Sequence, residues 1–128
     1  MADGVPYVYT ILRVTPCLER GESFNAGVVL FSRPGRFIGA RTMLDERVFA
    51  ALGGPASLTD VQQRLHLLEQ IATGDAAGGP VAALEASERF HWLAAPTSTV
   101  IQPSPVHTGV THDPAATLEH LFRRLVLR

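Results

Sequence analysis

The chain has 128 residues, of which 46% are hydrophobic and 18% charged, and its formal net charge at pH 7 is −1. This length suits a single domain over residues 1–128, and the hydrophobic content excludes an intrinsically disordered chain. All eleven basic residues are arginines, scattered along the sequence and balanced by twelve acids, whereas a nucleic-acid-binding protein shows a concentrated basic patch.

The single cysteine, Cys17, excludes an internal disulfide bond and a multi-thiolate zinc site. No segment has the pattern of a secretion signal, and the longest apolar runs are far shorter than a membrane span. The sequence contains no motif with the residue spacing of a metal-binding or phosphate-binding site. We therefore expect a cytoplasmic protein without a metal or other cofactor, whose partner is neither a nucleic acid nor a membrane.

The first third of the chain predicts an antiparallel meander. Residues 7–14 are aromatic and β-branched, as in a strand, and Pro16 ends this run. Residues 27–31 form a short continuous apolar run, which is consistent with a strand buried on both faces. A Pro-Gly pair suited to a tight turn follows, and residues 37–42 then form the returning strand.

The middle of the chain predicts two helices. Asp45 can cap a short helix that ends at Gly53. Ser57 and Asp60 have the spacing of a capping box for a longer helix, and Gly74 is placed to end it. Apolar residues at helical spacing form one stripe along this second helix. They are Leu58, Val61, Leu65, Leu68 and Ile71.

The last third predicts a short helix over residues 83–93, an extended segment over 98–110 and a closing helix capped by Asp113. Pro103 and Pro105 cannot donate to a β-ladder, so the extended segment belongs at a sheet edge or in a loop. Strands first and helices later predict an α+β fold. We expect a small antiparallel sheet, formed by the meander and this edge strand, with the helices packed on one face.

Two polar segments are candidates for a functional site. Residues 19–27 are either a turn held by its own Glu–Arg and Asn–backbone bonds or a surface on which Arg20, Glu22 and Asn25 contact a ligand or partner. Residues 87–109 contain the only tryptophan and many hydroxyl groups, which must bond to backbone, water or something bound. The candidate binding residues of the second segment are Arg89, Trp92, Thr99, Gln102 and His107.

Neither segment has a recognisable catalytic motif. A nucleophilic site would need Ser98, Ser104 or Cys17 together with His107 and an orienting carboxylate. The sequence has no G-x-S-x-G nucleophile elbow. The sequence therefore leaves catalytic residues unknown and favours a protein that is not an enzyme.

The same two segments carry a resemblance to a known family. The residues concerned are Glu19-Arg20-Gly21-Glu22, Asn25, Gly27, Ser87-Glu88-Arg89-Phe90, Trp92 and the run from Thr99 to Gly109. They resemble the domain-of-unknown-function family numbered 3037, which consists of small bacterial proteins with no established activity. Thr97 departs from the family, which usually has an arginine at this position. Some members are encoded beside proteins resembling HipA-type kinases, so the resemblance implies a partner of that kind but no reaction or cofactor.

Two functions remain open, and they predict different geometries. The first is a non-enzymatic interaction or accessory module that binds a protein partner or forms a homodimer, with Trp92 or Phe90 at the contact. The alternative is a small enzyme or ligand-binding protein with a pocket formed by residues 19–27 and 87–109. Convergence of the candidate binding residues in one concave site would favour the alternative, and their dispersal would favour the first function.

Overall fold

The apolar and β-branched residues of the first third form an antiparallel meander in the computed structural model, which describes residues 4–128. Strand β1 (Val5–Val14) pairs with β2 (Phe24–Ser32), and β2 pairs with β3 (Phe37–Thr42). The predicted meander is confirmed, although β2 begins three residues before the apolar run that predicts it. A β-bulge interrupts the register between β1 and β2 at Leu12 and Arg13.

The fourth position in the sheet is shared by two short strands. Strand β4 (Ile101–Pro103) lies beside residues 12–14 of β1, and β5 (His107–Thr111) lies beside residues 5–9 of the same strand. Within residues 4–128 this gives a five-stranded antiparallel sheet with the order β3-β2-β1-β4, in which β5 also pairs with β1. The proline-containing segment therefore lies at the sheet edge, as predicted.

A buried hydroxyl bridges the break between β4 and β5. Ser104 Oγ accepts a hydrogen bond from Ile11 N at 2.8 Å, while Ser104 N donates to Ile11 O at 2.7 Å. The displaced carbonyl of Ser104 accepts from Thr10 Oγ1 at 2.8 Å. Thr10 is 0% exposed and Ser104 is 5% exposed. The side chain thus replaces a carbonyl of the ladder, and the backbone of β1 stays paired where its edge partner is interrupted.

Polar side chains begin the helices as predicted. Asp45, Ser57 and Asp113 each accept a hydrogen bond from a backbone amide of the first helical turn, and Gly74 ends the second helix in the left-handed region at φ 77°. Within residues 4–128 the helices are α1 (Glu46–Leu52), α2 (Leu58–Thr73), α3 (Ala86–Leu93) and α4 (Pro114–Leu125), and the 3-10 turns are η1 (Ala76–Gly78) and η2 (Pro80–Ala83).

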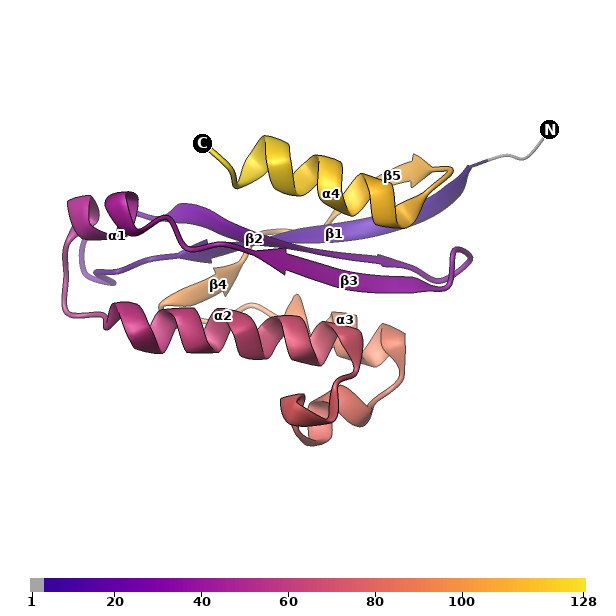
Figure 1. Ribbon diagram of the computed structural model, residues 1–128, viewed down its shortest axis with the longest axis horizontal. Coiled ribbons are helices and arrows are strands. Elements are labelled where there is room, and N and C mark those ends of the chain that lie inside the picture. Colours follow the sequence, from indigo (N-terminus) through magenta and orange to yellow (C-terminus); the bar gives the residue numbers. More distant parts are fainter. Residues whose placement is uncertain (1–3) are drawn as a thin grey trace.

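The helices cover both faces of the sheet (Figure 1). Helices α2 and α3 cover the face of the sheet on which Val29 of β2 lies. Helix α4 covers the other face, on which Val28 and Leu30 lie. The α+β class and the antiparallel sheet are confirmed, but the expectation that all helices lie on one face is wrong. The reason is that these three consecutive residues of β2 are all 0% exposed. Because neighbouring side chains of a strand point to opposite faces, both faces require a cover.

The first prediction concerns the apolar stripe of α2. Leu65 is 2% exposed inside the core cluster, so Leu65→Ala should lower the free energy of unfolding by about 2–5 kcal/mol, as truncation of a buried leucine does. Leu67, which is 41% exposed on the same helix, provides the matched control, and Leu67→Ala should change stability by no more than about 0.5 kcal/mol. Urea denaturation followed by circular dichroism measures both; equal effects would contradict the orientation of α2.

The second prediction concerns the hydroxyl at the strand break. Ser104→Ala leaves the buried amide of Ile11 without its acceptor, so the free energy of unfolding should fall by about 1–3 kcal/mol. In amide hydrogen exchange, Ile11 N–H should lose more protection than other amides of β1. Ser98→Ala makes the same change at an exposed serine and should have little effect. Unchanged protection at Ile11 would show that water or another group satisfies this amide.

Candidate functional site

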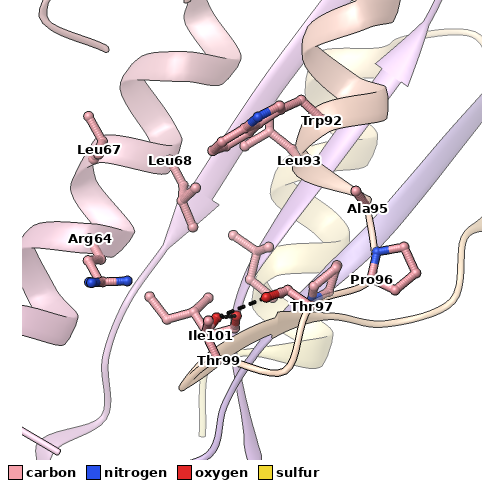
Figure 2. A pocket seen from close by; sticks show the side chains of 12 residues that line it. Arg64, Leu67, Leu68, Trp92, Leu93, Ala95, Pro96, Thr97, Thr99 and Ile101 are labelled. Atoms are coloured by element: carbon pink, nitrogen blue, oxygen red, sulfur yellow. Dashed lines mark hydrogen bonds between the residues drawn. The ribbon is translucent and has the colours of Figure 1, made fainter. Parts of the chain in front are cut away.

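An apolar groove of about 510 Å³ opens between α2, α3 and the segment that leads into β4 (Figure 2). Leu12 of β1 and Ile101 and Pro103 of β4 contribute to its lining from the sheet. Leu12 and Ile101 are buried core residues. The groove therefore lies where α2 and α3 leave part of one sheet face uncovered, next to the edge strand β4.

Helix α2 forms one wall of the groove through Arg64, Leu67 and Leu68. These positions are three and four residues apart, so they share one flank of the helix. Val61, Leu65 and Ile71, which are also on α2, are 2–3% exposed and hold the helix against the core. Leu68 belongs to the predicted stripe but is only half-buried, because it lies where the buried flank of α2 meets the groove.

Helix α3 forms the opposite wall through Trp92 and Leu93. Phe90 and Leu93 are 8% and 4% exposed and anchor the helix in the core, whereas Trp92 is 48% exposed. In Figure 2 the indole of Trp92 lies above the groove, with Leu67 and Leu68 across from it. The chain has no other tryptophan, and the structure leaves about half of this side chain uncovered.

The hydroxyl groups beside the groove are satisfied by the chain itself. Thr99 Oγ1 donates to Ile101 O at 2.9 Å and lies 3.3 Å from Thr97 Oγ1 (Figure 2). Gln102 Nε2 donates to Thr99 O at 2.8 Å. These bonds brace the segment that enters β4. Thr99 therefore lines the groove as the sequence suggests, while Gln102 supports the same segment from its neighbouring backbone.

Among residues 4–128, the lining of the groove contains no carboxylate, imidazole or thiol, and Arg64 is its one ionisable side chain. Arg64 is exposed and, within residues 4–128, makes no ion pair with a carboxylate. The other polar side-chain groups of this surface are the hydroxyls of Thr97 and Thr99 and the indole N–H of Trp92, and the rest is apolar. It is suited to holding an apolar group, with a guanidinium at the margin for an acceptor.

Residues 19–27 contribute nothing to the lining of this groove. Arg20 Nε donates to Glu22 Oε1 at 2.8 Å, and both side chains are exposed. The hydrogen bond and charge of Glu22 raise the pKa of Arg20. Asn25 Nδ2 donates to Leu125 O at 3.0 Å, at the last turn of α4. Arg20 and Glu22 thus pair with each other, and Asn25 joins β2 to a helix end.

Arg89 and His107 also lie apart from the groove. Arg89 Nη1 donates to Leu84 O, and its guanidinium lies close to Gly74 at the end of α2. His107 stacks on Tyr9 with ring centroids 5.1 Å apart. Tyr9 packs against the cluster under α4, so this histidine belongs to the opposite side of the sheet. Of the eight candidate binding residues, the structure therefore brings Trp92 and Thr99 to the groove, with Gln102 behind Thr99.

Sequence reasoning missed the contribution of α2. Arg64 and Leu67 line the groove, but neither belongs to the apolar stripe from which the sequence predicts the packing of this helix. Leu67 does not fit the helical spacing of that stripe. A large apolar residue on the polar flank of an amphipathic helix is the signal that could have identified this wall.

Within the part of the chain that the structure describes, no helix is long and apolar enough to cross a membrane. Residues 4–128 contain no group of three or more His, Cys, Asp or Glu side chains that could hold a metal ion.

The fold and the site define a class of protein: a small α+β domain with helices on both faces of an antiparallel sheet and an apolar groove at the sheet edge. The chain belongs to the DUF3037 family, described as a protein of unknown function, whose family model matches residues 9–126. This match covers nearly the whole chain and confirms the family resemblance. No curated protein and no solved structure matches the chain.

Proposed function

We propose that this protein is a cytoplasmic, non-enzymatic interaction module whose groove receives an apolar segment of a partner protein. The observation that carries the proposal is the exposure of two large apolar side chains on facing walls of one groove. Trp92 is 48% exposed and Leu67 is 41% exposed. Exposed apolar side chains that gather around a concavity are characteristic of protein-binding surfaces.

The chemistry of the walls supports a protein ligand. Tryptophan and arginine are the residue types that most often dominate the energy of protein interfaces, and here Trp92 and Arg64 line the same groove. Trp92 offers a large flat apolar surface with one N–H donor. Arg64 can pair with a carboxylate of the partner, since no carboxylate among residues 4–128 forms an ion pair with it.

Phe90 does not qualify as an alternative anchor. Its ring is 8% exposed and stacks on Phe31 with centroids 5.8 Å apart, so it serves the core. The proposal therefore rests on Trp92. A protein resembling a HipA-type kinase is the first partner to test, because the family resemblance implies one.

The third prediction uses Trp92 as both anchor and reporter. On binding the partner, tryptophan emission should shift to shorter wavelength and acrylamide quenching should fall, because a half-exposed indole becomes buried. Trp92→Ala should weaken binding about thirtyfold, equivalent to about 2 kcal/mol. Affinity is measured by isothermal titration calorimetry with the purified kinase-like partner, since this variant lacks the fluorophore.

The control is His91→Ala, which alters the exposed neighbour of Trp92 on α3 outside the groove lining and should bind like the parent chain. Partner binding that survives Trp92→Ala undiminished would contradict the groove as the docking site. Light scattering over a range of concentrations tests a second copy of the chain as occupant. If the parent chain dimerises and Trp92→Ala abolishes the dimer, the groove receives a second copy of the chain and not a partner protein.

A further inference from the structure

A second cavity, of about 350 Å³, lies where the turn between β2 and β3 meets the start of α3. Its lining includes Arg33 and Arg36 from the turn and Arg89 from α3, together with Glu85. The lining therefore contains three guanidinium groups and one carboxylate. Within residues 4–128, none of these four side chains forms an ion pair. The cavity carries an excess of positive charge that no close contact neutralises.

The turn holds its two arginines on a defined backbone. Arg36 N donates to Arg33 O at 3.1 Å, and Gly35 N donates to Ser32 Oγ at 3.0 Å. Gly35 packs so closely on Ser32 and Pro114 that a Cβ there would lie within 2.8–2.9 Å of their atoms. The turn is thus pinned to β2 and to the start of α4. The backbone positions of both arginines beside the cavity are therefore fixed.

The start of α3 adds backbone donors. Glu85 is the N-cap but makes no side-chain capping bond. The amides of Ala86, Ser87 and Glu88 have no hydrogen-bond acceptor among residues 4–128, and the first two of these residues line the cavity. The first turn of a helix carries partial positive charge and attracts anions. Arg89 Nε is buried without a partner as well, so donors are in excess throughout this region.

We propose that this cavity binds the phosphate group of a small phosphate monoester. Arg33 and Arg36 supply bidentate donors from the turn, and the amides of Ala86 and Ser87 supply donors from α3. A phosphate group suits this set better than a carboxylate for two reasons. It has three terminal oxygens to accept the available N–H groups, and its charge of about −1.5 to −2 at pH 7 matches the excess of two positive charges.

The ester group follows from the remaining walls. Phe31 and Ile38 also line the cavity, and their apolar atoms offer contact to a small organic group next to the phosphate. Arg89 contributes its charge and the N–H groups of Nη2, because its Nη1 already donates to Leu84 O and its Nε is buried. This site is separate from the apolar groove and does not depend on the proposed partner.

Isothermal titration calorimetry at constant ionic strength tests the proposal with phenyl phosphate, inorganic phosphate and benzoate as probes. We expect one saturable site for phenyl phosphate, with affinity at least about tenfold above that for benzoate and higher than that for inorganic phosphate. Arg33→Gln and Arg36→Gln should each weaken phenyl phosphate binding about tenfold or more, as loss of a charged hydrogen-bond donor does. Arg47→Gln removes the same charge from exposed α1, outside the cavity, and should change affinity less than twofold.

Arg36→Gly separates binding from folding. Arg36 has φ 51°, in the left-handed region that glycine tolerates without strain. This variant should melt at the same temperature as the parent chain or higher, yet bind phenyl phosphate about tenfold or more weakly. Three results would overturn the proposal: no saturable binding by the parent chain, equal affinity for benzoate, or equal weakening by Arg47→Gln. Equal affinity for inorganic phosphate would overturn the assignment of an ester.

Discussion

The continuous hydrogen bonding of β1 is the constraint on which both sides of the molecule depend. This strand has β2 on one side and a broken edge on the other, where β4 ends and β5 begins. The hydroxyl of Ser104 accepts the amide of Ile11 at the break, so the chain can change course without leaving a buried donor unpaired. Before the break, the chain comes from α3 along the groove. After it, β5 leads to α4 on the opposite face.

The cover on the opposite face is held by polar contacts at the middle and at the C-terminal end of α4. Arg41 of β3 pairs with Glu119, and its guanidinium carbon lies 4.5 Å from the centroid of the Phe122 ring. Asn25 donates to the carbonyl of Leu125 at the last helical turn. A guanidinium over an aromatic face and an amide at the end of a helix both add to the apolar contacts of Leu118 and Phe122. Asn25, which looks like a binding residue in the sequence, therefore has a structural role.

Helix α3 joins the two sites of the other face. It has only eight residues, and Phe90 and Leu93 hold it against the sheet. Its last turn presents Trp92 to the apolar groove, and its first turn faces the arginine-lined cavity. These two buried residues fix where α3 lies against the sheet, and so where it contributes to each site. The proposed functions thus use the side chains and backbone groups of α3 that the core leaves uncovered.

The sequence by itself determined the strands of the meander, the edge position of the proline-containing segment and the caps at Asp45, Ser57 and Asp113. These features depend on alternation, on proline chemistry and on hydrogen bonds between residues at most four positions apart, all of which can be read locally. Only the tertiary structure decided that α4 covers the second face, that Asn25 donates to the carbonyl of Leu125, and that Trp92 is exposed while Phe90 is buried. The exposure of an apolar side chain depends on which distant elements pack over it. For Trp92 the distant element is α2, and nothing within one helical turn of Trp92 specifies the position of that helix.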